Sequence, residues 1–493
     1  MNEQLSRRKF IKAAVAAATV IGFNLHTRSW VTQAQAATQP FAAVPKLDGV
    51  LLFDEASRKA IAVDGGNLFH RVPAAVLRPG SVQDVIKMVQ YANQHSLKVA
   101  IKGQGHSRYG QTQAEAGIVI DSSTLNAVQV PATESVDAQA GALWGQVVGV
   151  TLGKGLTPPV LLDFMGLAVG GTLNAGGLGD TSQHYGAQVD NVTELDVVTG
   201  DGRFVTCSAD RDSELFNMVL AGLGQCGIIV RARIRLVRAP SHVLLHNLIY
   251  DDLEKYIADQ AQLAMDGRFD HQYGNVIRKM DGTWSFTMQV GKFFTAPAEP
   301  NLTPLEAGLR FDSAAAPVRM TYLDYLYRNA ARWAAAVSSG RASRPSPAIA
   351  MWIPASATKD YVAAILSLPP NLSTFDGFSL WPLNTRRFTR PLSKVPNENQ
   401  MFSLWLFRSA PVGDQAALSA LLASNRELLA KMTAVGGKRY GPYSMVISPA
   451  EWEAHFGPDV WRRLSEAKKK FDSNHVLSPE PAMFGGRGQA GDA

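Results

Sequence analysis

The sequence predicts an α+β protein that folds into two or three domains. Its 493 residues are enough to form more than one hydrophobic core. Strand-like and helix-like patterns alternate from about Leu77 to Val237, and longer helices with turns rich in Pro, Ala and Ser follow over about 240–440. We therefore expect a first domain before residue 240 and a second after it. The segment from about Tyr440 is expected to return to the first domain.

The first domain begins with a predicted strand, a helix and a second strand. VLRPG (76–80) ends an extended segment. Ser81 and Asp84 have the spacing of a capping box, and the apolar residues over 82–89 fall on one helical face. LKVAIKG (97–103) then predicts a short buried strand that runs directly into GQGHS (103–107).

The remaining elements can be assigned in sequence order. They are a strand over 118–125, a helix over 142–155 that stops at a glycine, a glycine-dense stretch over 168–179, two strands joined at Asp201-Gly202 over 192–208, a helix over 213–227 and a strand over 228–237. In the second domain, MWIP (351–354) predicts a strand and residues 414–432 predict a long helix.

The N-terminal residues have the pattern of an export signal. SRRKFIK (6–12) precedes an apolar run over 13–23, and AQA (34–36) is a small-residue cleavage pattern. Arg7-Arg8 resembles a twin-arginine signal. The alternative is an uncleaved membrane anchor, but the run is shorter than the roughly 20 residues of a membrane span. We expect residues 1–36 to be removed and the mature protein to be periplasmic or secreted, without stable membrane insertion.

The charge of the protein does not indicate a nucleic-acid partner. Residues 1–36 hold Arg7, Arg8, Lys9, Lys12 and Arg28 against Glu3, so their removal lowers the formal net charge from +6 to +2. KKK at 468–470 has the pattern of a solvated helix face.

The cysteine and histidine content does not indicate a metal site. The two cysteines, Cys207 and Cys226, are too few for a structural zinc or iron–sulfur site, and the ten histidines lack HxxxH spacing. The sequence leaves open whether the two cysteines form a disulfide.

Two short glycine motifs have different contexts. GLGQCG (222–227) matches GxGxxG, but a helix precedes it and a strand follows, which is the reverse of a dinucleotide-binding turn. GQGHS follows a strand, and its glycines allow backbone N–H groups to approach an anionic pyrophosphate. Taken alone, that motif leaves His106 open as a core residue in a tight turn, a metal ligand, a base or a covalent anchor.

A second glycine cluster, VGGTLNAGGLG (169–179), strengthens the ligand interpretation. Two glycine-rich loops in one domain suit an extended cofactor that carries phosphates. Asp163 lies among apolar residues just before this cluster, so loss of hydration would raise its pKa and suit it to act as a base. The alternative is a turn aspartate that caps the next loop. A serine hydrolase is disfavoured because the sequence lacks a GxSxG elbow in strand–turn–helix context.

Five stretches, in this order, carry a family resemblance: VLRPGSVQDV, GQGHSRYGQ, LLDFMGLAVGGTLNAGGLG, VTELDVVTGDGRFVTCS and GLGQCGIIVRARI. They closely resemble the cytokinin dehydrogenases, which are flavoproteins of the vanillyl-alcohol-oxidase type. The resemblance resumes in WPLNTRRF (381–388), HFGPDVW (455–461) and HVLSPEPAMF (475–484), and so spans most of residues 70–484.

The resemblance implies a two-domain α+β flavoprotein, with an FAD-binding domain of two subdomains and an α+β substrate domain. After the signal peptide (1–36), the FAD-binding domain would take residues 41–238 and the C-terminal segment 441–493, and the substrate-binding domain would take 239–440.

The resemblance also implies roles for single residues. His106 would bond covalently to the flavin, and Asp163 would be the catalytic base. Further residues would contact the flavin or its pyrophosphate: Gly103, Gln104, Gly105, Ser107, Gln111, Thr172, Asn174, Leu178, Ile229, Tyr440 and Ser478.

The implied reaction oxidises the bond between the amine nitrogen and the side-chain carbon of N6-substituted adenines. Asp163 would take the amine proton while hydride passes to flavin N5, and the imine would hydrolyse to adenine and an aldehyde. A quinone-like acceptor or oxygen would then reoxidise the flavin. The alternatives are an FAD-linked oxidase of another amine, an alcohol or a sugar, or a flavin-bearing electron carrier or binding protein without turnover.

The sequence departs from the family pattern at several places. The family's Ser-Pro-Gly-Gln is SPEP here, with Pro481 in place of the glutamine, and its Tyr-Leu-Pro is Tyr440-Gly441-Pro442. Asn174 and Gly179 stand where serine is common, and Tyr185 where histidine is frequent. Since His106 and Asp163 match the pattern, the resemblance supports the cofactor chemistry more strongly than the identity of the substrate.

Overall fold

The computed structural model describes residues 41, 44–130, 132–369, 372, 377–480 and 482–484, together with the backbone of 20–24 and 29–32. Those two short segments form an antiparallel pair, β1 (Val20–Asn24) and β2 (Ser29–Thr32). The predicted signal peptide otherwise lies outside the described residues. None of the helices within the described residues is long and apolar enough to cross a membrane.

The first sheet has four strands in the order β3-β4-β6-β5, of which β4, β6 and β5 are parallel. Its elements are β3 (Val50–Leu52), α3 (Glu55–Ile61), β4 (Ala75–Arg78), α4 (Val82–Gln94), β5 (Val99–Lys102) and β6 (Ile118–Asp121). All four residues of β6 are buried, which explains its continuous apolar pattern in a parallel sheet.

The second sheet is antiparallel, with the order β10-β9-β11-β7, beside a small pair of β12 and β8. The elements are β7 (Ser135–Gln139), α5 (Trp144–Leu152), β8 (Leu156–Thr157), α6 (Val169–Ala175), α7 (Ser182–Tyr185), β9 (Val192–Val198), β10 (Phe204–Ser208), α8 (Ser213–Val219), β11 (Ile228–Arg235) and β12 (Val237–Arg238). The predicted turn lies between β9 and β10, where Gly202 has a φ of 76°. GLGQCG lies between α8 and β11, which confirms the helix-then-strand context.

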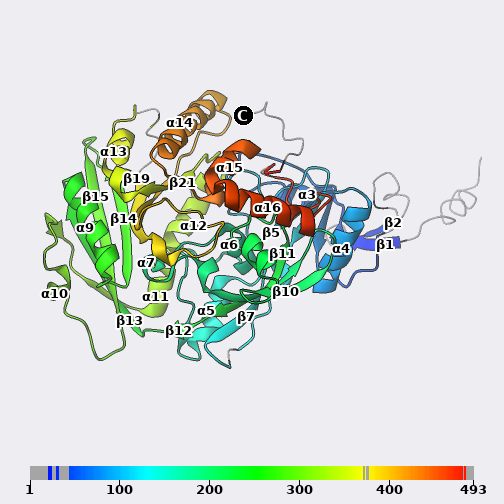
Figure 1. Ribbon diagram of the computed structural model, residues 1–493, viewed down its shortest axis with the longest axis horizontal. Coiled ribbons are helices and arrows are strands. Elements are labelled where there is room, and N and C mark those ends of the chain that lie inside the picture. The colour runs from blue at the N-terminus through cyan, green and yellow to red at the C-terminus, as the bar shows by residue number, and fades with distance from the viewer. Residues whose placement is uncertain are drawn as a thin grey trace, which may run out of the picture.

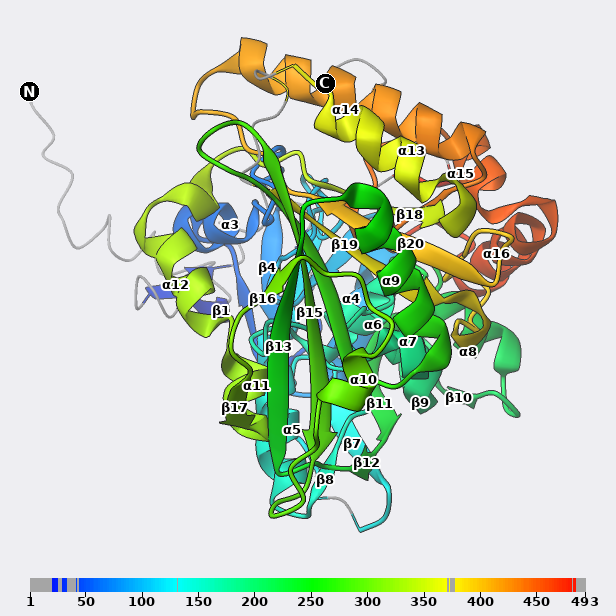
Figure 2. The ribbon, with the colours of Figure 1, turned by 90° about the vertical axis from the view of Figure 1, so that its left-hand side faces the viewer.

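The third sheet has nine antiparallel strands in the order β16-β13-β15-β14-β19-β20-β18-β21, with β17 also paired to β13. The elements are β13 (His242–Tyr250), α9 (Leu253–Asp266), β14 (His271–Arg278), β15 (Trp284–Phe294), α10 (Thr303–Glu306), β16 (Ser313–Ala314), β17 (Val318–Thr321), α11 (Tyr322–Tyr327), α12 (Ala330–Ser338), β18 (Ile349–Pro354), α13 (Ala355–Leu366), β19 (Gly377–Asn384), β20 (Gln400–Leu406), α14 (Gln415–Ala434) and β21 (Lys438–Arg439). Helices α9, α13 and α14 pack against this sheet (Figure 2).

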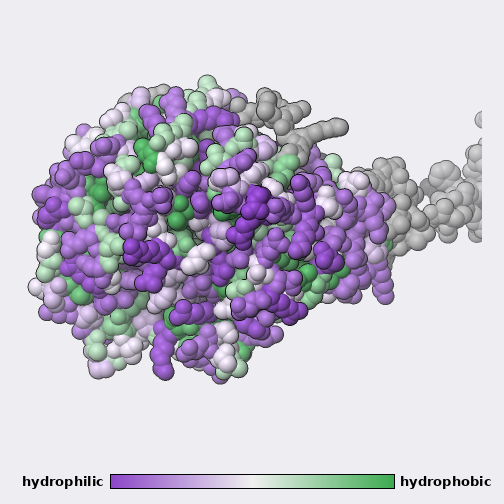
Figure 3. Space-filling view, viewed as in Figure 1, coloured by the Kyte–Doolittle hydropathy of each residue, from purple (hydrophilic) through white to green (hydrophobic). Residues whose placement is uncertain are grey.

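The sheets therefore change between β12 and β13, which is next to the predicted domain boundary at residue 238. In Figure 1 the nine-stranded sheet lies at one end of the molecule and the blue N-terminal elements lie towards the other. On the face in Figure 3, hydrophilic residues predominate and hydrophobic ones are scattered among them.

The predicted capping box at the start of α4 is wrong. Ser81 makes no capping hydrogen bond, and its Oγ donates instead to Asp48. Asp84 is fully buried and accepts hydrogen bonds from the backbone N–H groups of Asp48, Gly49 and Gly80. Asp84 therefore binds the backbone of preceding segments and does not cap its own helix.

The C-terminal segment packs against the N-terminal half of the protein (Figure 1). It contains α15 (Pro449–Phe456) and α16 (Pro458–Phe471), and α16 packs against α8. Beyond α16, Val99 donates to the Val476 carbonyl and accepts from the Ser478 N–H, each at 2.8 Å. Lys468 Nζ donates to Asp472 Oδ2 at 2.7 Å and to the Gln225 carbonyl at 2.8 Å.

Lys468→Met is expected to lower the free energy of unfolding by about 3–5 kcal/mol, because it leaves the buried Asp472 carboxylate without its cation. Only 3% of the Lys468 side chain and none of the Asp472 side chain is exposed. Lys470→Met is the matched control on the same helix. Lys470 pairs with Glu214 in solvent, so that change should cost less than about 1 kcal/mol. If urea denaturation showed the same decrease in the free energy of unfolding for both variants, this role of Lys468 would be contradicted.

Candidate active site

A cavity of about 1160 Å³ lies between the loops of the first domain and the nine-stranded sheet. Its walls come from the loop after β5, the stretch around Asp163, α6, β14, α12, β19 and the end of β20, and from residues near Tyr440 and Ser478. The volume exceeds the roughly 300–1,000 Å³ of pockets for drug-sized ligands. The cavity is thus large enough for an extended ligand.

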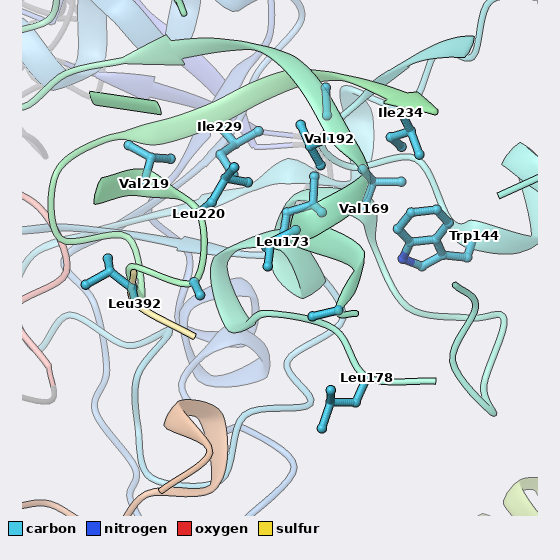
Figure 4. Close-up of a cluster of buried hydrophobic side chains, with 14 of the residues drawn as sticks. Trp144, Val169, Leu173, Leu178, Val192, Val219, Leu220, Ile229, Ile234 and Leu392 are labelled. Atoms are coloured by element: carbon cyan, nitrogen blue, oxygen red, sulfur yellow. The ribbon is translucent and has the colours of Figure 1, made fainter. Parts of the chain in front are cut away.

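Eleven of the thirteen predicted site residues line this one cavity. They are Gln104, Gly105, His106, Ser107, Gln111, Asp163, Thr172, Asn174, Leu178, Tyr440 and Ser478. Gly103 and Ile229 are not among the lining residues. A Cβ atom on Gly103 would lie 2.9 Å from the Cβ of Ala168, so this glycine permits the close approach of the segment before α6. Ile229 belongs to the same core cluster as Val169 and Leu173 (Figure 4).

The loop after β5 is held by an aspartate that sequence reasoning missed. Asp64 accepts hydrogen bonds from the N–H groups of Gly66 at 3.0 Å and Gly110 at 2.8 Å, and from Ser107 Oγ at 3.3 Å. Burial raises the pKa of Asp64. Its only sequence signal is its position before two glycines, which is also common in ordinary turns.

Lys102, at the end of β5, binds the segment that precedes Asp64. Its Nζ donates to the carbonyls of Ile61 and Val63, and burial lowers its pKa. Gly105 has a φ of 66°, and a Cβ there would lie 2.6 Å from Lys102 Cε. The left-handed backbone therefore favours a glycine at this position, and a side chain there would also displace the end of Lys102.

His106 lies beside two aromatic rings. Its ring centroid is 5.2 Å from that of Phe164 and 5.7 Å from that of Trp333. Burial, and then the positive charge of Arg108, lower the pKa of His106 to about 4, so the imidazole is neutral at neutral pH. A neutral imidazole keeps one nitrogen with a free electron pair. Among the described residues no cluster of three or more His, Cys, Asp or Glu side chains could hold a metal ion.

The second glycine cluster is partly helical, whereas the sequence predicted a loop. Residues 169–175 form α6, and the backbone turns after it at Gly176 and Gly177, with φ values of 116° and 75°. Asn174 Nδ2 donates to the Gly170 carbonyl at 2.9 Å, while its buried Oδ1 has no hydrogen-bond partner among the described residues. The Thr172 hydroxyl accepts from Trp144 Nε1 at 2.9 Å.

Residues from distant parts of the sequence are joined by hydrogen bonds at the cavity wall. Tyr440 OH accepts from the Gly177 N–H at 3.1 Å, and Gln111 Nε2 donates to the Gly441 carbonyl at 2.9 Å. The Ser478 carbonyl accepts from Gln225 Nε2 at 3.0 Å. These bonds join the C-terminal segment to both glycine-rich stretches.

Asp163 lies on the cavity wall, where no other described residue donates a hydrogen bond to its carboxyl group. Burial, and then the negative charge of Asp180, raise the pKa of Asp163 to about 6. The arginines Arg328 and Arg332 oppose this rise. An unpaired carboxylate with a pKa near the working pH has the properties required of a general base.

The cavity also has aromatic walls, to which Phe164, Tyr273, Trp333, Trp381, Trp405, Phe407 and Tyr443 contribute. The rings of Tyr273 and Trp381 are stacked with centroids 5.0 Å apart. Such walls suit a flat, apolar ligand.

The departures from the family pattern have different consequences. A Cβ on Gly179 would lie 2.1 Å from the Leu161 carbonyl oxygen, so the serine that is common there would not fit this backbone. A Cβ on Gly441 would lie 3.3 Å from the Leu223 side chain, so a larger residue at that position would require this side chain to shift. Tyr185 is 37% exposed and does not line the cavity. Pro481 lies outside the described residues.

Cys207 and Cys226 are both buried and free in the structure. Burial raises the pKa of each thiol to about 12, so neither forms a reactive thiolate near neutral pH.

The cavity fits FAD by its volume, the conformation of its glycines and its polar groups. The left-handed backbone at Gly105, Gly177 and Gly224 occurs where the polypeptide lines or adjoins the cavity, and a Cβ on Gly171 would meet open space. Besides Asn174 Oδ1, the buried hydroxyl of Thr112 also lacks a partner within the described ranges. Glycine-rich backbone and unpaired polar atoms are what a ligand with phosphates and a polar ring edge requires.

Comparison with known proteins gives a consistent result. Residues 73–208 match the family profile described as FAD binding domain, and residues 295–484 match the one described as Cytokinin dehydrogenase 1, FAD and cytokinin binding. The crystal structure of 6-hydroxy-D-nicotine oxidase from Arthrobacter nicotinovorans has a TM-score of 0.70 at 21% identity, covering 88% of this protein and 98% of that one. The fold is therefore the predicted two-domain type of the vanillyl-alcohol-oxidase flavoproteins.

Two sequence relatives extend over nearly the whole protein. An uncharacterized oxidoreductase of the fasciation locus of Rhodococcoides fascians is 35% identical over 88% of this sequence and 98% of its own length. Cytokinin dehydrogenase 9 of Oryza sativa subsp. japonica is 32% identical over 89% of this sequence and 91% of its own. The fold and the cavity define an FAD-dependent oxidoreductase. By these relatives, the protein belongs to the cytokinin dehydrogenase family.

Proposed function

We propose that this protein is a cytokinin dehydrogenase that oxidises N6-substituted adenines at the bond between the amine nitrogen and the side-chain carbon. The observation that carries the proposal is the unpaired carboxyl of Asp163, whose pKa is raised to about 6, on the wall of a cavity with aromatic sides. A planar purine suits the aromatic walls, and a secondary amine offers a proton to the carboxylate.

The residues of the protein have distinct tasks in this reaction. FAD, when bound, supplies the two-electron acceptor that takes a hydride from the carbon next to the amine. Asp163 accepts the amine proton, and the side chain of Phe164 and the aromatic walls exclude water around the purine. Water then hydrolyses the resulting imine to adenine and an aldehyde. A quinone-like acceptor or oxygen then takes the two electrons that were removed from the substrate.

The proposal includes covalent attachment of the flavin through His106. The low pKa of His106 supports it, because a neutral imidazole nitrogen can act as the nucleophile. Gln104, Gly105, Ser107 and Gln111 would hold the flavin and its pyrophosphate on one side, and Thr172, Asn174, Leu178, Tyr440 and Ser478 on the other.

Export by the twin-arginine route is also part of the proposal. The pattern over residues 6–36 supports it, and that route carries folded proteins, which suits a protein that must take up FAD before export. A covalent bond would then prevent loss of the cofactor outside the cytoplasm.

A turnover screen tests the substrate. The purified flavoprotein is mixed anaerobically with isopentenyladenine, with other secondary amines and with polyols, and flavin bleaching is followed. We expect bleaching by isopentenyladenine with release of adenine and an aldehyde. Bleaching by polyols alone would refute the cytokinin substrate, and no bleaching by any donor would favour an electron carrier.

A further inference from the structure

An ion pair joins Asp180, which lines the cavity, to Arg328, which is not among the lining residues. Asp180 follows the second glycine cluster, and Arg328 lies at the C-terminal end of α11, just before α12. Arg328 Nη2 donates to Asp180 Oδ2, and only 8% of the aspartate side chain and 14% of the arginine side chain are exposed. Asp180 lines the same cavity as Asp163. Neither member of the pair was predicted from the sequence.

Other groups hold Asp180 in its ionised form. Tyr325 OH donates to Asp180 Oδ2 at 3.5 Å, and His271 Nδ1 lies 3.5 Å from the same oxygen. The guanidinium of Arg328 also lies over the Tyr325 ring, 4.2 Å from its centroid. Although burial opposes ionisation, Arg328 and His271 lower the pKa of Asp180 well below its usual range.

Asp163 has a different set of neighbours. The segments of the two aspartates are in contact, since a Cβ on Gly179 would lie 2.1 Å from the Leu161 carbonyl oxygen, and Asp163, Asp180, Arg332 and Tyr273 line one cavity. The charged and titratable groups that influence Asp163 are Asp180, Arg328, Arg332 and Tyr273. None of them donates a hydrogen bond to its carboxyl group among the described contacts. Two carboxyl groups on one cavity wall therefore differ in kind: Asp180 is fixed and paired, and Asp163 is unpaired and open to the cavity.

We propose that the Asp180–Arg328 pair is a positioning element of the active site, which fixes a negative and a positive charge beside Asp163 and so sets the pH at which Asp163 accepts the substrate proton. The inference rests on the proposed function, in which Asp163 is the base. Asp180 and Arg328 act through Asp163 and are not assigned a contact with substrate.

A stability cycle tests the pair without any substrate. The pKa of Asp163 is raised from its ordinary 3.8 to about 6, so its charged form destabilises the folded state. This penalty is absent below about pH 4 and complete above about pH 6. Asp163→Asn should therefore raise the Tm of the flavoprotein by roughly 2–4 °C near pH 7.5 and change it little near pH 4.

The rise in Tm caused by Asp163→Asn should change when either member of the Asp180–Arg328 pair is removed. In an Asp180→Asn background the negative neighbour is gone, so the gain from Asp163→Asn should fall to about half or less. In an Arg328→Gln background the cation is gone, so the gain should increase. The pH below which kcat/KM falls should also shift. We expect it to be roughly one pH unit lower in Asp180→Asn and roughly one pH unit higher in Arg328→Gln.

Controls separate this role from a purely structural one. Asp190 is also a largely buried carboxylate that joins distant segments, since it accepts from the N–H groups of Ala187 and Thr389, but it does not line the cavity. Asp190→Asn should lower the Tm and leave unchanged the rise in Tm that Asp163→Asn causes. Arg328→Lys keeps the charge and should keep the wild-type pH limb.

The inference would be overturned if Asp163→Asn raised the Tm by the same amount in all backgrounds. It would also be overturned if the pH below which kcat/KM falls shifted in the same direction in Asp180→Asn and Arg328→Gln. Failure of every adenine substrate would refute the proposed function instead. The stability cycle would still report on the pair in that case.

Discussion

Asp163→Asn is expected to reduce turnover of isopentenyladenine about 10³-fold, because the amide cannot accept the amine proton and general-base catalysis contributes roughly 10²–10⁴-fold. The cofactor should be unaffected, because the change removes one charge and almost no volume. The measurement is single-turnover flavin reduction by stopped flow, with the flavin content of each preparation determined from its visible spectrum.

The pH dependence supplies a second signature of the same residue. Since the pKa of Asp163 is about 6, kcat/KM of the wild-type protein should fall as the pH drops below 6. The residual activity of Asp163→Asn should lack this limb. Asp190→Asn, at a carboxylate outside the cavity, should retain both the limb and most of the activity. Turnover of Asp163→Asn at more than about a tenth of the wild-type rate would exclude Asp163 as the base.

His106→Ala is expected to abolish the acid-stable attachment of flavin completely, because it removes the only imidazole that lines the cavity among the described residues. Wild-type protein precipitated with acid should give a yellow pellet and a colourless supernatant. The variant should release all of its flavin, and its spectrum in the folded state should show whether FAD still binds without the bond.

His242→Ala is the matched control for this experiment. His242 begins β13, where its ring packs on Phe294 at 5.5 Å, and it does not line the cavity. Its variant should keep the colour in the pellet. Flavin released from the wild-type pellet would show that the bond is absent, and flavin retained by His106→Ala would assign it to another residue.

The sequence predicted the elements that have strong local signals. The turn at Gly202 and the helix-then-strand context of GLGQCG both follow from short local patterns. The α+β fold was predicted as well, because the family motifs occur in order along most of the sequence. The structure then brings His106, Asp163 and nine other predicted residues to one cavity.

Features that depend on tertiary contacts were not predicted. Asp84 satisfies three backbone N–H groups from two segments instead of capping α4 with Ser81. The Asp180–Arg328 pair joins residues 148 positions apart, and no local spacing marks either partner. The helix α6 contains Gly170 and Gly171, whose low helix propensity favoured a loop, but its Val169 and Leu173 are fully buried.

The position of Ser478 has a consequence for how the molecule is made. The wall that holds His106 near one end of the polypeptide is completed by Ser478 near the other, and Val99 forms backbone bonds with Val476 and Ser478. The residues around His106 therefore cannot complete this wall by themselves. Ser478 must also have been synthesised and have packed against Val99 before the cavity has its final form.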